Sequence, residues 1–273
     1  RRYYKIINDD LLYPINQSLD LYYLNRINVD RRLHISAPGE STPYEVTEIY
    51  LNSEPKDFKE SEKKGIEKTI EICNIPEQGE ILFFSTSQNQ IKKTCNELNR
   101  KIPSNIIALP FLGGIKMTQE KKELVEKIDK AIYSIDVSKE DIYDYFTENK
   151  KLEDTKRVSK GTYNRAIIIA TNVAEASITI KRLRYIIDLG YEVNVTYNPK
   201  EGVDKSTTDK ISESSRVQRK GRVGRVATGT VYYMYKKGSR ENILPSYSIC
   251  TNNISDSLYK ILKSSYLEKE FIK

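Results

Sequence analysis

Residues 166–170 read Ala-Ile-Ile-Ile-Ala, a short and wholly apolar run followed at once by the polar residues Thr171 and Asn172. A run this short and this rich in β-branched residues is typical of a strand covered on both faces. Residues 185–188 and 80–84 have the same character. Several such strands in one chain predict the interior of a parallel sheet.

Helical and strand patterns alternate on both sides of these runs. Residues 44–51 alternate apolar and polar side chains as in a strand, and residues 56–73 place apolar side chains among Lys and Glu as in a surface helix. We expect strands at 44–51, 80–84, 105–109, 166–170, 185–188 and 230–235, and helices at 56–73, 88–100, 118–130 and 214–225. This alternation predicts an α/β fold in which helices flank a parallel sheet.

The remaining segments suggest how the chain is organised. Residues 192–210 resemble a hairpin, and the polar residues 133–160 are interpreted as a peripheral insertion that ends in a loop at Lys160 and Gly161. Residues 1–34 lack a clear period and are interpreted as a connecting segment from a preceding domain. We expect the main domain at 35–245 and a helical lead into a following domain at 246–273.

Composition narrows the class of protein. The chain has 273 residues with 45 Lys and Arg against 38 Asp and Glu, a net charge of +7 that fits a polyanionic partner but also fits a lysine-rich solvated surface. No run reaches the ~18 apolar residues of a membrane span, and no signal peptide is evident, so we expect an intracellular protein with no membrane partner. Three widely spaced cysteines and the single His34 favour neither a disulfide framework, nor a zinc site, nor a histidine-based triad.

The most specific stretch is residues 215–225, Ser-Arg-Val-Gln-Arg-Lys-Gly-Arg-Val-Gly-Arg. On a helix, Gln218, Arg222 and Arg225 stand at i, i+4 and i+7 and line one stripe, and the two glycines would let that helix lie close to another surface. Two guanidinium groups on one ridge suit a multi-oxygen anion such as a triphosphate. A solvated basic helix face is the alternative, and Arg216 and Arg219 could instead bind nucleic-acid phosphates.

A second polar stretch follows the strand at 166–170. Residues 170–180 read Ala-Thr-Asn-Val-Ala-Glu-Ala-Ser-Ile-Thr-Ile, and the next strand ends in Asp188-Leu189-Gly190. A turn rich in small polar residues exposes backbone N–H groups at the carboxyl edge of a parallel sheet, where ligands bind in this architecture. Thr171, Asn172 and Ser177 could then hold phosphates while Glu175 supports the loop. An N-capped helix after a strand would explain Asn172 or Ser177 singly.

These stretches together resemble the second RecA-like domain of superfamily 2 DExH/DEAH-box RNA helicases. Residues 218–225 match the pattern Q-R-x-G-R-x-G-R, and residues 171–180 resemble T-N-x-A-E-T-S-x-T-I, with Ala176 where the family usually has Thr. Residues 81–91 resemble the strand and polar turn that touch RNA, and Tyr197-Asn198-Pro199 resembles the hairpin that takes part in strand separation. The poxviral or giant-virus DExH NTPase/RNA helicases are the most similar in character.

The resemblance implies a role for particular residues. It assigns Gln218, Arg222 and Arg225 to catalysis, with the arginines at the γ-phosphate and Gln218 helping to position water. It assigns Asp188, Gly190 and Arg219 to the nucleotide, and Phe146, with Tyr145 or Tyr143 as alternatives, to stacking on its base. Residues assigned to RNA are Ser85, Thr86, Thr171, Asn172, Ser177 and Tyr197.

The same resemblance implies partners that lie outside these 273 residues. The sequence contains no G-x-x-x-x-G-K-S/T phosphate loop and no D-E-x-H box. We therefore expect a preceding RecA-like domain in cis to bind ATP or another NTP with Mg²⁺, RNA as the nucleic acid with DNA as the alternative, and a cytoplasmic or virion location. The competing hypothesis is a non-catalytic nucleic-acid-binding module. A Rossmann-type dinucleotide enzyme is disfavoured because no G-x-G-x-x-G follows a strand.

Overall fold

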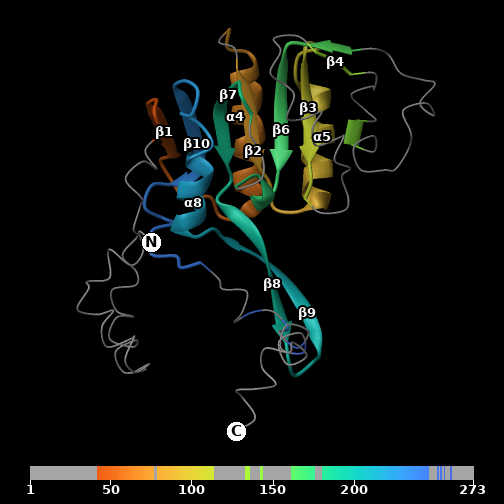
Figure 1. The fold of residues 1–273 in the computed structure, drawn as a ribbon, viewed down its shortest axis with the longest axis vertical. Coiled ribbons are helices and arrows are strands. Elements are labelled where there is room, and N and C mark those ends of the chain that lie inside the picture. Colours follow the sequence, from red (N-terminus) through yellow and green to blue (C-terminus); the bar gives the residue numbers. More distant parts are fainter. Residues whose placement is uncertain are drawn as a thin grey trace, which may run out of the picture. The chain divides into compact units, whose positions relative to one another are not determined.

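The structure is a computed structural model that describes residues 42–76, 79–113, 133–135, 142–143, 161–175 and 180–245, with residues 251, 253, 255 and 259. Its centre is a six-stranded parallel sheet in the order β1-β10-β7-β2-β6-β3 (Figure 1). The strands are β1 Val46–Leu51, β2 Glu80–Phe84, β3 Ile106–Phe111, β6 Arg165–Ala170, β7 Leu183–Asp188 and β10 Gly229–Lys236. All six strands expected from the sequence are present, which confirms the α/β parallel-sheet fold.

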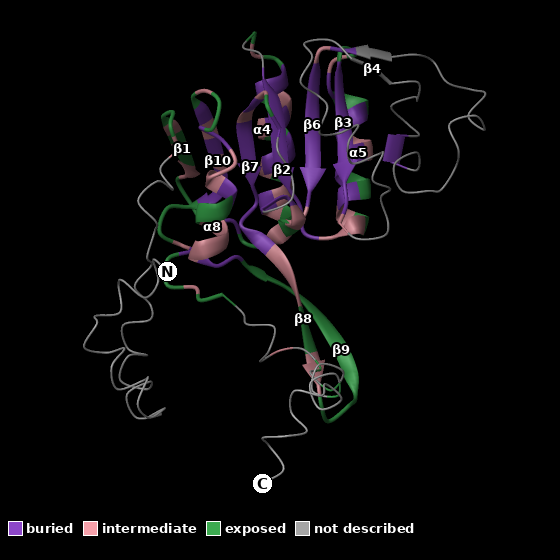
Figure 2. Ribbon diagram, in the orientation of Figure 1, coloured by how far each residue is buried: buried purple, intermediate pink, exposed green. Residues whose placement is uncertain are grey.

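Burial shows which strands are covered on both faces, and these include the edge strand β3 as well as the central strands. Every residue of β2, β3 and β6 is buried, whereas β1, at one edge of the sheet, alternates between half-buried and exposed positions (Figure 2). The continuous apolar runs therefore mark strands covered on both faces, as the sequence predicts, whereas the alternating run belongs to a partly exposed edge strand. The largest part of the apolar core lies along these strands.

Two amphipathic helices pack against the sheet. Helix α4, Phe58–Cys73, contacts β7 and β10, and helix α5, Gln88–Lys101, contacts β3 and β6. Each begins at a side-chain cap, because Asp57 accepts from the Glu60 amide at 2.9 Å and Ser87 accepts from the Gln90 amide at 3.3 Å. The buried stripe of α5 includes Cys95, and Cys73 of α4 is buried as well, so both thiols belong to the core.

Between β7 and β10 the chain forms an antiparallel hairpin and a short helix. Strand β8, Tyr191–Asn198, pairs with β9, Val203–Lys210, and the hairpin extends from the carboxyl edge of the sheet (Figure 1). Its base is closed by the Ile211 amide, which donates to the Gly190 carbonyl at 3.1 Å. Helix α8, Glu213–Lys220, follows and contacts β7. The hairpin expected at 192–210 is therefore confirmed.

Some expectations are corrected or lie outside the described residues. The helix expected at 214–225 ends at Lys220. The insertion expected at 133–160 contains a strand, β4 Tyr133–Ile135, which pairs antiparallel with β5 Gly161–Tyr163, so Gly161 begins a strand and not a loop. Outside the described residues lie the helix expected at 118–130, the segments 1–34 and most of 246–273, His34, Cys250, Phe146, Tyr145 and Ser177. No helix in the described part is long and apolar enough to cross a bilayer.

Candidate nucleotide and nucleic-acid interface

The ends of β2 and β6 bring several polar residues together. These strands are neighbours, and the Ser85 amide donates to the Ala170 carbonyl at 2.7 Å, so Ser85 and Thr86 lie beside Thr171. Ser85 is 1% exposed, and its hydroxyl has no hydrogen-bond partner within the described residues. A buried hydroxyl without a partner carries a desolvation cost, which a bound polar group would relieve.

A single 3-10 turn, η4 (Asn172–Glu175), follows β6. It is closed by the Ala174 amide, which donates to the Thr171 carbonyl at 3.0 Å. Asn172 is exposed at its start, whereas Glu175 is buried at its end. The strand thus runs into one tight turn with a polar, solvent-facing beginning and not into a regular capped helix.

A buried ionic cluster lies behind this turn. The Arg219 side chain has no exposed surface and forms ion pairs of 2.7 Å with Glu175 and 2.7 Å with Asp188. Its guanidinium also stacks over the Phe84 ring at 4.7 Å. Asp188 accepts further hydrogen bonds from the Gly190 amide at 2.9 Å and the Tyr235 hydroxyl at 3.0 Å. A buried ion pair of this kind is tolerated because its remaining lone pairs and N–H groups are satisfied.

This cluster corrects the role expected for three residues. Arg219, Asp188 and Gly190 were assigned to the nucleotide, but the first two are fully buried and bind each other. Gly190, also buried, has a φ of +76°, and an added Cβ would lie 2.3 Å from the Tyr235 ring. Within this domain the Arg219 and Asp188 side chains therefore serve the packing of α8 against β7. Glu175 supports the turn, as the sequence predicts, through its contact with Arg219.

The stripe proposed for residues 215–225 is wrong in its geometry. Helix α8 ends at Lys220 and is capped by Gly221, whose amide donates to the Val217 carbonyl at 2.9 Å. Arg222 and Arg225 therefore lie in the following turn and not on the helix with Gln218. Gly221 makes no close approach to another surface, since an added Cβ would meet only helix carbonyls at 3.4 Å.

The turn after α8 is shaped by Gly224. Its φ is +74°, a value that favours glycine, and an added Cβ would lie 2.5 Å from the Val46 side chain. The Gly224 carbonyl accepts from the Tyr44 amide at 3.1 Å, which ties the turn to the segment before β1. Of the two glycines, Gly224 therefore allows a close approach to Val46, but it does so from a turn and not from a helix.

Arg222 and Arg225 are neighbouring cations, and neither forms an ion pair with a carboxylate among the described residues. Arg222 is half-buried, its Nε makes no hydrogen bond within the described residues, and burial together with the nearby Arg225 lowers its pKa. Arg225 is exposed and donates from Nε to the Gly221 carbonyl at 2.7 Å. Gln218 is exposed as well. Two adjacent guanidinium groups repel each other, and a polyanion placed between them would relieve that repulsion.

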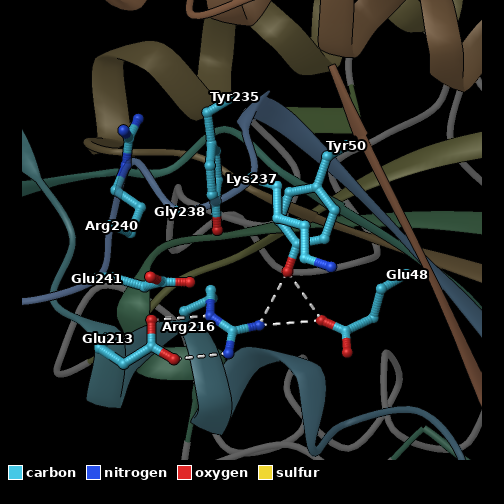
Figure 3. Close-up of a pocket in the computed structure, with 9 residues that line it drawn as sticks. All are labelled: Glu48, Tyr50, Glu213, Arg216, Tyr235, Lys237, Gly238, Arg240 and Glu241. Carbon is cyan, nitrogen blue, oxygen red and sulfur yellow. Dashed lines mark hydrogen bonds and ion pairs between the residues drawn. The ribbon is translucent and has the colours of Figure 1, made fainter. Parts of the chain in front are cut away.

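Arg216 serves a different purpose from the one considered for it. Its guanidinium lies at a small cavity of about 140 Å³ between the start of α8 and the ends of β1 and β10 (Figure 3). It is held by Glu213 at 2.6 Å and Glu48 at 2.9 Å, and it donates to the Tyr50 hydroxyl at 3.1 Å. With its charge compensated on two sides, Arg216 fastens α8 to the edge strand and does not present a free cation to nucleic-acid phosphates.

Strand β8 of the hairpin has one apolar and one polar face, whereas β9 places mostly polar residues opposite both. Tyr197 points to the same face as Tyr191, Val193 and Val195, because alternate residues of a strand share a face. Tyr197 is half-buried and pairs in register with Asp204, and Val195 is 45% exposed. The structure thus places Tyr197 near the tip of the hairpin, apart from the polar group at the ends of β2 and β6.

The aromatic residues considered for base stacking are only partly described. Tyr143 is 8% exposed, donates its hydroxyl to the Gln88 carbonyl at 3.3 Å and lies beneath the Lys92 ammonium at 5.2 Å from the ring centre. It therefore packs on α5, which removes it as an alternative stacking residue. Sequence reasoning missed Tyr235, whose hydroxyl donates to Asp188 at 3.0 Å, because the strand pattern indicates only a core position.

A family model described as the helicase conserved C-terminal domain matches residues 64–227. The chain belongs to this helicase C-terminal domain family. The matched range of the helicase domain contains the polar group after β2 and β6, the ion pairs of Arg219 with Glu175 and Asp188, and the two arginines. It also contains the hairpin, so the residues assembled at the carboxyl edge of the sheet are those of the family domain.

Relatives of the helicase domain are found in viruses and cells. The chain is 44% identical over 267 residues to a protein of Acanthamoeba polyphaga mimivirus provisionally named an ATP-dependent RNA helicase, covering 97% of this chain and 15% of that protein. A Schizosaccharomyces pombe protein with a similar provisional name is 28% identical over 188 residues, covering 63% of this chain and 16% of its own length. The chain therefore spans about a sixth of these relatives.

Solved structures confirm the fold of the helicase domain. The crystal structure of the Escherichia coli DExH-box NTPase HrpB superimposes with a TM-score of 0.58 at 21% identity, covering 80% of this chain and 23% of that one. At this level of identity the likeness concerns the arrangement of the sheet and helices. The expectation of a RecA-like helicase fold with a hairpin is thereby confirmed.

Proposed function

We propose that this chain is the C-terminal RecA-like half of an NTP-dependent RNA helicase and that it completes an active site whose other half binds the nucleotide. The observation that carries the proposal is the pair Arg222 and Arg225, neither of which forms an ion pair with a carboxylate among the described residues. Both arginines lie in the turn after α8. Arg222 is close enough to Glu175 for the negative charge of Glu175 to favour the cationic form of Arg222.

The arginines would act on the γ-phosphate. A facing RecA-like domain with a phosphate loop and an acidic box would hold the NTP and Mg²⁺, because this sequence contains neither motif. Closure would bring Arg222 and Arg225 against the charge that develops on the transferred phosphoryl group, and Gln218 would help to position the attacking water. The chemistry thus needs cations that arrive from the opposite wall of the cleft.

The polar group at the ends of β2 and β6 would bind the RNA backbone. Thr86, Thr171 and Asn172 offer hydroxyl and amide groups at the edge where parallel sheets bind ligands, and Ser85 adds a hydroxyl without a described partner. We include Ser177, which follows in the sequence and lies outside the described residues. Contacts of this kind position a strand without reading its bases. Tyr197, near the hairpin tip, would contact the end of the bound strand.

Base recognition would depend on Phe146. An aromatic ring stacks on any base through its π-face, which predicts tolerance of all four NTPs. Tyr145 remains the alternative, since Tyr143 packs on α5. The test is KM for ATP, GTP, CTP and UTP in the wild type and in Phe146→Ala. A rise of KM for every NTP would support stacking, and unchanged values would remove it.

The proposal is tested by NTPase activity of the natural full-length protein with and without single-stranded RNA. We expect RNA-stimulated hydrolysis in an intracellular protein of this kind, and no hydrolysis by the 273-residue chain alone. Robust RNA-stimulated hydrolysis by this chain alone would contradict the two-half model. RNA binding by the full-length protein without any NTP hydrolysis would favour the competing hypothesis, a non-catalytic nucleic-acid-binding module.

A further inference from the structure

One ion pair joins the two ligand-binding parts of the domain. Glu175 ends the turn η4, whose first residue, Asn172, is assigned to RNA together with the preceding Thr171. Arg219 lies in α8, which leads to Arg222 and Arg225. Their side chains meet at 2.7 Å, 44 residues apart in sequence. We propose that the Glu175–Arg219 pair is a latch through which RNA binding at η4 sets the position of Arg222. This inference rests on the proposed function and names a positioning pair, not catalytic residues.

Backbone hydrogen bonds extend the latch in both directions. On the RNA side, the Ala174 amide donates to the Thr171 carbonyl at 3.0 Å. Thr171, which is assigned to RNA, and Ala174, which precedes Glu175, therefore belong to one closed turn. On the nucleotide side, the Arg222 amide donates to the Arg219 carbonyl at 3.1 Å. A displacement of the turn can therefore reach Arg222 through a single side-chain contact and one amide hydrogen bond.

The charge of Glu175 also acts directly on Arg222. The negative charge of Glu175 stabilises the cationic form of Arg222, whereas the neighbouring Arg225 destabilises it. Glu175 therefore offsets part of the repulsion between the two arginines when no phosphate is bound. A shift of Glu175 would change where the Arg222 guanidinium rests, because a half-buried charge is screened less by water than an exposed one.

The latch can be cut without removing the anchor of α8. Arg219 keeps its 2.7 Å ion pair with Asp188 when Glu175 is replaced, and the charge of Glu192 also acts on Arg219. Removing the carboxylate of Glu175 therefore does not leave a buried cation unpaired, which would be the costly outcome. Glu175→Gln keeps the shape and the ability to accept a hydrogen bond from Arg219 while it removes the charge.

The domain contains a matched control for this substitution. Arg240 is 1% exposed and forms a 2.7 Å ion pair with Glu54, so it too is a buried arginine held by a partly buried glutamate. This second pair connects the turn after β10 to the segment after β1, and Arg240 donates to the Gly190 carbonyl at 3.0 Å. Among the described residues, no hydrogen bond or ion pair joins Glu54 or the Arg240 side chain to η4 or α8. Glu54→Gln thus makes the same chemical change outside the proposed path.

The experiment measures coupling between the two ligands in the full-length protein. The Kd for a fluorescent single-stranded oligoribonucleotide is determined by anisotropy with and without a non-hydrolysable ATP analogue. We expect the analogue to change the wild-type Kd by about 5-fold or more, within the usual range of allosteric coupling. In Glu175→Gln the change should fall below about 2-fold while RNA still binds. Glu54→Gln should keep the wild-type change.

Hydrolysis supplies a second readout. RNA stimulation of kcat should fall in Glu175→Gln with KM for ATP little changed, because the latch positions Arg222 and does not bind ATP. Glu175→Asp, which keeps the charge on a shorter side chain, should recover part of the coupling. It also serves as the test variant if Glu175→Gln does not fold.

Three outcomes would overturn the inference or its basis. Wild-type coupling in Glu175→Gln would refute the latch. An equal loss in Glu175→Gln and Glu54→Gln would also refute it, because a general loss of rigidity would then account for the effect. If the wild-type protein shows no RNA-stimulated hydrolysis and no coupling, the proposed function itself fails, and that result is distinct from the other two.

Discussion

The Arg219 Nη1 atom lies 2.7 Å from the Asp188 Oδ1 atom, and neither side chain has any exposed surface. The pair joins α8 to the end of β7 in the centre of the sheet. Both ions are fully desolvated, so each depends on its remaining partners. Arg219 also pairs with Glu175 and stacks over the Phe84 ring. Asp188 also accepts hydrogen bonds from the Gly190 amide and the Tyr235 hydroxyl.

Replacing Arg219 by Met should therefore destabilise the domain strongly. The substitution preserves much of the volume but leaves the carboxylates of Asp188 and Glu175 without their cation, and breaking a buried pair in this way costs about 3–5 kcal/mol. The free energy of unfolding of the 273-residue chain, from urea titration, is the measurement. Arg225→Met is the control, because Arg225 is exposed and a change there should stay within about 0.5 kcal/mol. Similar losses for both variants would contradict a special role for the buried pair.

Arg222→Ala and Arg225→Ala should each lower kcat of the full-length protein by roughly 10³-fold or more, the usual effect of losing an arginine finger. RNA affinity should change little, since neither side chain belongs to the polar group at the ends of β2 and β6. Lys237→Ala, which removes an exposed cation from the turn after β10, should leave kcat unchanged. Normal hydrolysis combined with lost RNA binding would assign the two arginines to RNA and not to the nucleotide.

Glu80 should make the stability of the domain depend on pH. Burial raises the pKa of this fully buried carboxyl to about 7, although the Ala166 amide and Arg182, whose Nη1 lies 3.2 Å from its Oε1, oppose the rise. Because the folded-state pKa lies above the unfolded value, the folded state holds the extra proton between about pH 4.5 and 7. The contribution of Glu80 to stability is thus present at low pH and is lost as the pH rises through 7.

Glu80→Gln removes this titration. Relative to the wild type, the variant should gain roughly 2–3 kcal/mol in free energy of unfolding between pH 5 and pH 8. Urea titrations of both proteins at the two pH values provide the comparison. A difference between the proteins that does not change with pH would show that Glu80 is ionised throughout the range.

Gly224→Ala should destabilise the turn that carries the two arginines. A φ of +74° costs an alanine ~1 kcal/mol, and the collision of its Cβ with Val46 and Thr42 adds to this, for a total of about 2–3 kcal/mol. Gly202→Ala is the matched control, because Gly202 has a φ of +67° but nothing within 4 Å of an added Cβ. Equal losses at the two positions in thermal or urea unfolding would mean that the close approach at Gly224 contributes nothing.

The sequence predicted the sheet well because apolar runs report burial directly. Every strand was expected within about two residues of its bounds, and β2 matched at both ends. The end of α8 was missed because Gln218, Arg222 and Arg225 keep a helical spacing even though the helix stops at Lys220. The two glycines were the available signal, since glycine often follows the last turn of a helix.

The candidate site was predictable in its residue types but not in its internal contacts. The spacing of Thr171, Asn172 and Ser85 after strands placed them correctly at one edge. The burial of Arg219 could not be foreseen, because its partners Asp188 and Glu175 lie 31 and 44 residues away and periodicity carries no information on such pairs. An arginine within a basic stretch is expected to be exposed, and only the folded structure shows that distant carboxylates bury it.

The hydrogen bond between Ile211 and Gly190 pinches the hairpin at its root, so the residues between them leave the sheet and return to it at one point. Removing or adding opposite pairs along the ladder from Tyr191–Lys210 to Asn198–Val203 changes only how far the tip projects. Each step alters that projection by about 3.3 Å per residue pair and leaves α8 and β10 where they are. The length of the hairpin can therefore change by residue insertion or deletion independently of the rest of the domain.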